Sequence, residues 1–526
     1  MKTPELLSSA KVFLDRRVLV MLLLGFSAGL PILLIFGTLS VWLREAGVAR
    51  AMVTYFSWAA LGYSFKFVWA PLVDQLDLPI LSALLGRRRS WLLLSQCMVM
   101  VAIVSMAGVD PAVGDRPLVM LAVGAVLLGF SSATQDIVID AFRIESASAK
   151  MQAILSSTYI AGYRIAMIVA GAGALFLAEY LGSEKGHYSY TAWRQTYLLM
   201  AGIMVVGIVT TLSIKEPKRS ITVTHSVGEN LQLVLLFILC VGVFIGSYLV
   251  TADHALQIRD TLAEFFNNQY LAGTLVESVR LGIGVLLAWL MARLLLRLRI
   301  VRRRVVVTAY IEPVADFFSR YGARSAWLLL ALVGLYRISD IVLGVISNVF
   351  YYDLGFAKSE IAAVSKVFGL IMTIVGGFLG GLLSFRYGVM KILLLGAILS
   401  AATNLLFVLL AQAGHSLPLL YVVISADNLS AGLAGTAFVA FLSALTNIRF
   451  TAMQYAIFSS LMTLLPKILG GYSGSMVDSI GYSSFFLVTA LIGVPVIVLI
   501  LLATRWLDLE QNENNTKTDP TGIPSK

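Results

Sequence analysis

The chain has 526 residues, of which 59% are hydrophobic and 13% are charged, and its mean hydropathy is +0.87. Soluble domains are about half apolar and a quarter charged, so this composition excludes a soluble globular protein and indicates a chain held mostly within a membrane. Two cysteines, Cys97 and Cys240, lie in apolar runs, which leaves no basis for a disulfide framework or a cysteine metal site.

Apolar runs long enough to cross a bilayer, about 20 residues each, follow one another along the chain. The first run is too long for the apolar core of a signal peptide and lacks a cleavage site, so we expect it to remain as a helix. Six runs come first, two follow in the middle, and six close the chain. The fourteen predicted spans are 18–43, 52–76, 91–108, 117–142, 151–178, 193–214, 230–251, 271–296, 326–352, 360–385, 389–412, 417–446, 451–477 and 484–507.

The basic residues test this topology. With a cytoplasmic N-terminus, 26 of the 39 lysines and arginines fall on cytoplasmic segments and seven on periplasmic loops, which agrees with the positive-inside rule. The sequence therefore predicts a multi-pass protein with both termini in the cytoplasm. The net charge of +10 is a topology signal, and nucleic acid is excluded as a partner.

The predicted fold class is an all-α integral membrane protein with two six-helix halves and two inserted helices. The expected segments are a cytoplasmic N-terminus (1–17), an N-terminal half (18–215), an inserted helix pair with a basic cytoplasmic segment (216–324), a C-terminal half (325–507) and a disordered cytoplasmic tail (508–526). The basic segment alternates arginines with apolar residues, a pattern typical of a helix on the lipid surface.

One pattern ends the second span of each half. In the first half, Ala70-Pro71-Leu72-Val73-Asp74 precedes Gly86-Arg87-Arg88-Arg89, and in the second half, residues 381–388 precede Lys391. Both stretches resemble the loop motif of the major facilitator superfamily, with Phe385 in the place of an aspartate. The resemblance implies two six-helix halves around a central cavity.

Four longer stretches resemble the AmpG-type muropeptide permeases of that superfamily. They are LGFSAGLP at 24–31, KFVWAPLVD at 66–74, SSATQDIVIDAFR at 131–143, and residues 427–456, which begin with Asp427-Asn428-Leu429-Ser430. The resemblance covers residues 18–215 and 310–507, and Asp427 stands where the family has glutamate.

This resemblance implies a transporter of the bacterial inner membrane. It would import N-acetylglucosaminyl-1,6-anhydro-N-acetylmuramyl peptides from the periplasm by proton symport, for peptidoglycan recycling and β-lactamase induction. Its partners would be a small glycopeptide substrate, protons and the lipid bilayer, and we expect a monomer without cofactors. Two alternatives stay open: a facilitator of another bulky polar solute, such as a siderophore or a CoA ester, and a muropeptide sensor that transports nothing. The sequence has no P-loop, zinc spacing or nucleophile–base pair, so an enzyme is not predicted.

Ionisable side chains inside the spans are the candidate functional groups, because each costs about 2.5–3.5 kcal/mol at mid-helix and needs a partner or water. Asp136 and Asp140 are four residues apart and share a helix face, which suits groups that bind and release protons. Asp140 is equally well explained by a structural cluster with Arg143. Asp340 and Asp427 complete the predicted proton-coupling set, although Asp340 and Arg337 are also spaced to neutralise each other.

The predicted substrate-binding residues are polar or aromatic side chains near these carboxylates. They are Lys66, Gln135, Arg164, Tyr163, Tyr336, Arg337, Asn428, Gln454 and Tyr455. For Lys66 and Arg164 the alternatives are a latch within the first half and a site for the carboxylates of a peptide. Gly25, Gly29 and Ala133 are predicted to pack helices closely and to leave room beside the cavity.

Overall fold

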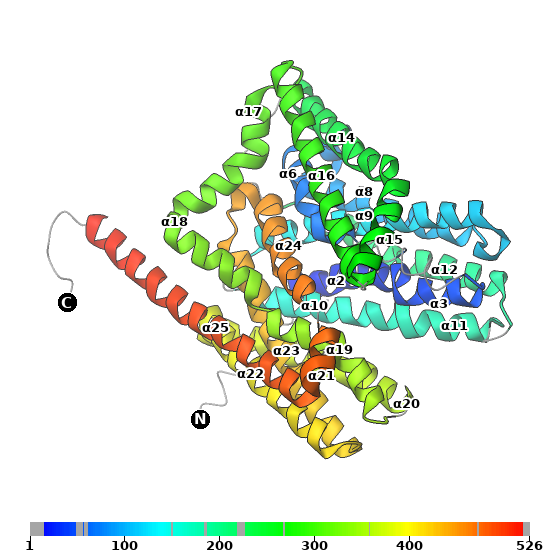
Figure 1. The fold of residues 1–526 in the computed structure, drawn as a ribbon. Helices are drawn as coiled ribbons and strands as arrows, with labels where there is room; N and C mark the ends of the chain where they lie inside the picture. The colour runs from blue at the N-terminus through cyan, green and yellow to red at the C-terminus, as the bar shows by residue number, and fades with distance from the viewer. Residues whose placement is uncertain are drawn as a thin grey trace. The chain divides into compact units, whose positions relative to one another are not determined.

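The computed structural model describes residues 15–48, 56, 61–148, 151–183, 187–217, 227–266, 269–356, 358–470 and 473–518, and these are almost entirely helical (Figure 1). Among them, 12 helices are long and apolar enough to cross a membrane. Each corresponds to one predicted span. Of the two other predicted spans, 52–76 lies partly outside the described residues and 451–477 overlaps the helix Thr451–Gly470, so the count of fourteen stays a prediction.

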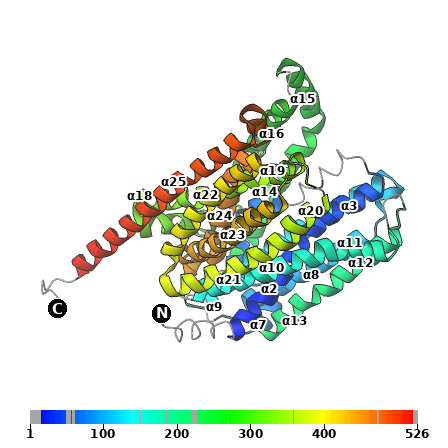
Figure 2. The ribbon, with the colours of Figure 1, turned by 90° about the horizontal axis from the view of Figure 1, so that it is seen from below.

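The chain divides into two compact units. The first, here called the main unit, comprises Met1–Val73, Leu78–Ser220 and Phe317–Lys526, and the second, the inserted unit, comprises Asp74–Asp77 and Ile221–Asp316. The main unit contains both halves, and Figure 2 shows its long helices running roughly parallel to one another.

The N-terminal half is a bundle of long helices interrupted by short ones. Its elements are α2 (Arg16–Ile35), α3 (Gly37–Glu45), α5 (Leu61–Phe65), η3 (Lys66–Val68), α6 (Ala70–Gln75), α7 (Leu81–Leu85), α8 (Arg87–Ala107), η4 (Pro111–Val113), α9 (Asp115–Ser146), α10 (Gln152–Ile168), η6 (Val169–Gly173), α11 (Ala174–Tyr180), α12 (Tyr190–Ile203) and α13 (Val205–Ser213).

The C-terminal half has the same kind of organisation. Its elements are α18 (Glu312–Leu335), α19 (Ile338–Asp353), α20 (Lys358–Ile361), η8 (Ala362–Phe368), α21 (Gly369–Tyr387), α22 (Val389–Ala413), α23 (Leu417–Leu445), η9 (Ile448–Phe450), α24 (Thr451–Gly470) and α25 (Ser473–Thr518). Helix α25 bends at Gly481 and extends to Thr518, so it enters the tail for which the sequence predicts disorder.

The inserted unit is a helical hairpin with a third helix at its turn. Helices α14 (Val227–Val250) and α16 (Gln269–Arg297) pack against each other, and α15 (Ala252–Phe266) packs on both. The chain then continues through α17 (Arg303–Val306) and η7 (Val307–Ile311). The basic segment that follows the hairpin is therefore helical.

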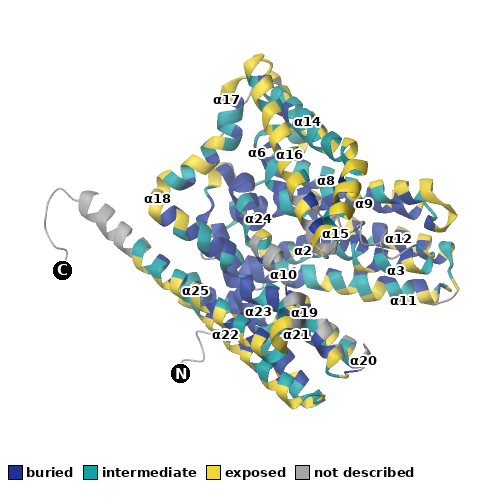
Figure 3. Cartoon of the chain, viewed as in Figure 1, coloured by how far each residue is buried: buried dark blue, intermediate teal, exposed yellow. Residues whose placement is uncertain are grey.

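Each half of the main unit has its own apolar core. Trp42, Trp193 and Tyr197 are buried together in the first half, and Phe350, Phe407 and Phe486 in the second. Large apolar side chains are also exposed, for example Val119, Met120, Val123 and Val126 on α9 and Leu487, Leu491, Val494, Val498 and Leu501 on α25 (Figure 3). Such faces suit a lipid environment, in which exposed apolar surface carries no penalty.

Glycines set the distance between α2 and α10. A Cβ atom at Gly25 would lie 2.2 Å from the carbonyl oxygen of Tyr159, and one at Gly29 would lie 2.3 Å from that of Tyr163. Gly162 of α10 meets the backbone of Leu22 in the same way, at 2.0 Å. The two backbones therefore touch, and this contact fixes α10 and the side chains that it carries.

We predict that Gly29→Ala destabilises the protein, because the added methyl group overlaps backbone that has no freedom to rotate away; overpacking of this kind costs about 1–3 kcal/mol. The measurement is the thermal unfolding midpoint of the purified protein in detergent. Gly202→Ala on α12 is the control, since a Cβ atom there has no neighbour within 4 Å, and alanine favours an exposed helix. Equal midpoints for the two variants would contradict the packing argument.

Candidate functional site

A cavity of about 610 Å³ lies between the two halves of the main unit. Its walls come from α2 and α10 on one side and from α19, α21, α23 and α24 on the other, with part of η8. The charged lining residues are Arg164, Arg337, Asp340 and Asp427, and the aromatic ones are Tyr159, Tyr163, Tyr351 and Phe438. The cavity therefore combines a few charges with apolar and aromatic walls, which is typical of ligand sites.

Arg164 is the half-buried cation on the α10 wall. No carboxylate of the described chain forms an ion pair with Arg164, and its Nη1 lies 3.5 Å from the sulfur of Met167. Arg337 lines the same cavity, so its positive charge repels that of Arg164. An uncompensated guanidinium in poorly hydrated surroundings is a binding site for an anionic group.

The opposite wall carries one paired and one unpaired carboxylate. Asp340 lies 3.1 Å from Arg337 Nε and accepts a hydrogen bond from the Ser400 hydroxyl. For Asp427 the described residues provide neither an ion-pair partner nor a hydrogen-bond donor, although it lines the cavity. Asn428 is used locally: its amide donates to the Ile424 carbonyl at 3.1 Å and accepts from Thr373 at 2.9 Å.

Several predicted site residues of the first half lie outside the cavity lining, in a buried cluster. Lys66 is 3.9 Å from Asp140, and Asp140 is 3.2 Å from Arg143. Gln135 donates to the Ser27 hydroxyl at 3.1 Å, and Ala133 is fully buried. Asp136 accepts a hydrogen bond from Tyr159 at 3.4 Å, and since Tyr159 lines the cavity, this bond connects the cluster to it.

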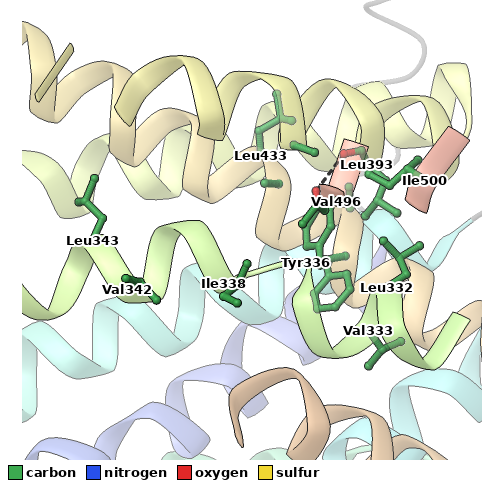
Figure 4. Packing of buried hydrophobic residues seen from close by; sticks show 14 of the residues in the cluster. Leu332, Val333, Tyr336, Ile338, Val342, Leu343, Leu393, Leu433, Val496 and Ile500 are labelled. Carbon is green, nitrogen blue, oxygen red and sulfur yellow. Dashed lines mark hydrogen bonds between the residues drawn. The ribbon is translucent and has the colours of Figure 1, made fainter. Parts of the chain in front are cut away.

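Three predicted residues of the second half are held by packing. Tyr336 donates to the Leu393 carbonyl at 3.0 Å and stacks on Phe438 with ring centroids 4.4 Å apart; Figure 4 shows its ring among Leu332, Leu393 and Val496. The Gln454 amide oxygen accepts from Arg320 and from the backbone of Asn447. The Tyr455 ring lies under the Arg143 guanidinium, 5.3 Å from centroid to carbon.

A polar latch joins the two halves at one end of the main unit, where α8 and α24 begin and α9 and α23 end. Arg88 of α8 lies 2.6 Å from Glu145 of α9 and donates to Thr451 of α24 at 2.8 Å. The Thr451 hydroxyl donates to Glu145 at 2.5 Å. Arg143 donates to Ser443 of α23 at 2.7 Å. We call this the basic end, because Arg16 and Arg89 also lie there, each bonded to a carbonyl at the end of α13.

Two of the latch residues, Arg88 and Arg143, are fully buried. The local fold orients their side chains. Glu216 follows α13 and accepts hydrogen bonds from the backbone N–H groups of Arg88 and Arg89, at 2.8 and 3.1 Å, which anchors the start of α8. Close packing of α21 against α10 reinforces the latch: a Cβ atom on Gly381 of α21 would lie 2.7 Å from Ser157 Oγ of α10.

Glu145, Ser443 and Thr451 are latch residues for which the sequence predicts no role. A signal for Thr451 was present, since it lies within the 427–456 stretch beside the basic Arg449. The described residues contain no group of three or more histidine, cysteine, aspartate or glutamate side chains arranged to hold a metal ion.

Comparison with known proteins identifies relatives over nearly the whole chain. The Major Facilitator Superfamily model matches residues 327–525, and the model described as Acetyl-coenzyme A transporter 1 matches residues 17–232. Putative transporter AmpG 4 of Rickettsia felis is 30% identical over 94% of this chain and 98% of its own length. The anhydromuropeptide permease of Escherichia coli K12 is 28% identical over 96% of this chain and 83% of its own length.

Solved structures show the same fold at low sequence identity. The proton:xylose symporter XylE aligns with a TM-score of 0.56 at 12% identity, covering 92% of this chain and 94% of its own. FucP, a major facilitator transporter solved in the outward conformation, aligns with a TM-score of 0.56 at 12% identity, covering 93% and 99%.

The fold and the central cavity are those of a major facilitator transporter, a multi-pass membrane protein that moves a small molecule and is not an enzyme. Within that class, the chain belongs to the AmpG family of transporters. The predicted all-α membrane fold and the resemblance to this family are confirmed.

For the latch, we predict that the double substitution Thr451→Val and Ser443→Ala loosens the contact between the halves and leaves the ion pairs of the first half intact. It removes three hydrogen bonds between the halves, each contributing about 0.5–1.5 kcal/mol. In a background without Cys97 and Cys240, a thiol introduced by Ser157→Cys at the buried α10–α21 contact is then expected to react with a maleimide about tenfold faster or more.

The control is a thiol introduced by Ser95→Cys, which is equally buried but lies inside the first half. Its reaction rate is expected to stay unchanged in the double variant. If both thiols react faster, the substitutions have unfolded the half and have not opened the latch.

Proposed function

We propose that this protein imports anhydromuropeptides across the bacterial inner membrane, from periplasm to cytoplasm, as a monomer and by proton symport. Both termini then lie in the cytoplasm, as the distribution of basic residues predicts. The name of the Escherichia coli relative suggests the substrate, and one observation supports it: the unpaired Arg164 in the cavity between the halves.

The size and lining of the cavity suit a glycopeptide. Its volume of about 610 Å³ lies within the range of small-molecule sites, about 300–1,000 Å³. Tyr159 and Tyr163 of α10 and Phe438 of α23 line it, and aromatic rings of this kind pack against the apolar faces of sugar rings. A peptide carboxylate of the substrate would bind Arg164, and its hydroxyl and amide groups would meet Asn428 and the tyrosine hydroxyls.

The latch supports a transport cycle by alternating access. It closes the basic end, which we expect to face the cytoplasm, so the cavity in this state would receive substrate from the periplasmic side. Release to the cytoplasm then requires two bonds to break: the one from Arg88 to α24 and the one from Arg143 to α23. Because these bonds are few and polar, the two states need differ by only a few kcal/mol.

Electrostatics gives the reason for proton coupling. A membrane potential of 100 mV drives one positive charge inward with about 2.3 kcal/mol, so an anionic substrate moves against the potential unless protons accompany it. Asp427 is our candidate for the proton site, since its charge is uncompensated within the described part of the cavity. Asp136, Asp140 and Asp340 are each bonded to a neighbour and are the less favoured sites.

A CoA ester is the second candidate substrate. The match of residues 17–232 to the acetyl-coenzyme A transporter model favours it, and its phosphates would also bind Arg164. The remaining alternative is a sensor that binds muropeptide without transporting it. A sensor predicts binding of the substrate with no accumulation.

Uptake into right-side-out membrane vesicles tests the proposal. Labelled anhydromuropeptide is expected to accumulate, to be displaced by unlabelled anhydromuropeptide and not by acetyl-CoA, and to lose accumulation when a protonophore is added. Asp427→Asn is expected to equilibrate the label without concentrating it. Binding without entry would eliminate the importer, displacement by acetyl-CoA would favour the second substrate, and accumulation indifferent to the protonophore would remove proton coupling.

We further predict that Arg164→Gln raises the KM for uptake at least tenfold, because a hydrogen bond to a charged group contributes about 1.5–3 kcal/mol. Arg164→Lys is expected to recover part of the loss, since it keeps the charge but not the bidentate geometry. Arg194→Gln, at an exposed arginine of α12 outside the cavity, serves as the control. A KM unchanged by Arg164→Gln would show that the substrate anion binds elsewhere.

A further inference from the structure

The inserted unit carries a dense arginine cluster that the transport cycle does not use. Six arginines lie within twelve residues around the turn from α16 to α17, and all six are exposed: Arg293, Arg297, Arg299, Arg302, Arg303 and Arg304. None of them forms an ion pair with a carboxylate of the described residues. The cluster therefore presents a concentrated positive charge that the described chain does not neutralise.

The backbone beneath this cluster is held in place. Val301 and Leu295 are buried against Leu236 of α14. The backbone N–H of Arg302 donates to the side-chain oxygen of Gln232, also on α14, at 2.9 Å. The N–H of Ile300 closes the end of α16 by donating to the Leu295 carbonyl at 3.1 Å. The arginines thus project from a fixed turn of the hairpin.

Arg299 occupies an unusual backbone conformation. Its φ of 61° is left-handed, and this position just after a helix is one that glycine normally fills because a side chain is strained there. A non-glycine residue at such a strained position motivates the hypothesis that its side chain has a local function. The long cationic side chain of Arg299 is therefore better explained by a ligand than by the stability of the turn.

Apolar side chains alternate with these arginines and indicate which ligand they meet. Leu294, Leu298 and Ile300 are about half exposed, at 47%, 59% and 45%. Val279–Arg297 is a candidate membrane span, so the turn that follows lies where the span leaves the bilayer. Arg293 covers the Trp289 ring at 4.0 Å, a pairing suited to the membrane–water interface.

We propose that this turn binds the phosphate headgroups of anionic phospholipids in the surrounding bilayer. The guanidinium groups would donate paired hydrogen bonds to phosphate oxygens, and the exposed leucine and isoleucine side chains would lie among the acyl chains. The inserted hairpin would thereby be anchored at its turn by lipid of one charge class. A nucleic acid or a soluble anion would leave these apolar side chains in water, so the bilayer is the favoured source of phosphate.

Native mass spectrometry of the full chain in detergent, titrated with phosphatidylglycerol or phosphatidylcholine, tests the proposal. The unaltered protein is expected to retain phosphatidylglycerol preferentially. The triple substitution Arg299→Gln, Arg302→Gln, Arg303→Gln is expected to lower that affinity about 100-fold, at roughly a factor of five per basic residue. Glycerol 3-phosphate at equal concentration is expected not to compete, which separates lipid from soluble phosphate.

The matched control removes three exposed basic residues from the main unit, by Arg17→Gln, Lys215→Gln and Lys391→Gln. It makes the same change in net charge and is expected to keep the preference for phosphatidylglycerol. The variant Arg299→Gly is a control for misfolding, because glycine relieves the strain of the left-handed backbone. In phosphatidylcholine it is expected to unfold at a temperature no lower than the unaltered protein. It is expected to bind phosphatidylglycerol about fivefold more weakly.

Equal retention of the two lipids by the unaltered protein would overturn the proposal. An equal loss of phosphatidylglycerol affinity in the control triple variant would show that only overall charge matters, and would also overturn the proposal. Competition by glycerol 3-phosphate would reassign the cluster to a soluble anion. Since the cluster lies outside the cavity lining, these outcomes are independent of muropeptide uptake.

Discussion

The free-energy cost of placing a charge within a bilayer determines how the ionisable side chains inside the main unit are arranged, since each buried ion needs a partner or water. Lys66 and Arg143 both pair with Asp140 in the first half, and Arg337 pairs with Asp340 in the second. Arg164 and Asp427 are left without partners in the described residues, and both line the cavity. The same constraint that stabilises the halves thus marks the surface where a charged solute and a proton would complete the pairing.

The compensated charges also connect the cavity to the contact between the halves. Arg143 bonds Asp140 within its own half and Ser443 across the boundary, and it lies over the ring of Tyr455. Tyr159 lines the cavity and donates to Asp136, one helical turn from Asp140. A change of charge at these carboxylates would reach the latch through adjacent side chains, as our proposal of proton-coupled transport requires.

Much of the site was predictable from the sequence, and the remainder depended on the rotation of the helices. Arg164, Arg337 and Asp427 were found because an ionisable residue in an apolar span is conspicuous, and the structure places all three at the cavity. Tyr336, Gln454 and Tyr455 lie instead in packing contacts and hydrogen bonds. Their polarity is visible in the sequence, but the face that each presents is set by the neighbouring helix.

The sequence by itself determined that the chain is an all-helical membrane protein, because hydropathy and charge are summed along the chain and need no knowledge of contacts. Gly25 and Gly29 also predicted close helix packing, which the structure places between α2 and α10. Only the tertiary structure decided which charges neutralise one another. Arg88 and Glu145 each bond Thr451, which lies 363 and 306 residues further along the chain, and pairing at that range is a property of the packed helices.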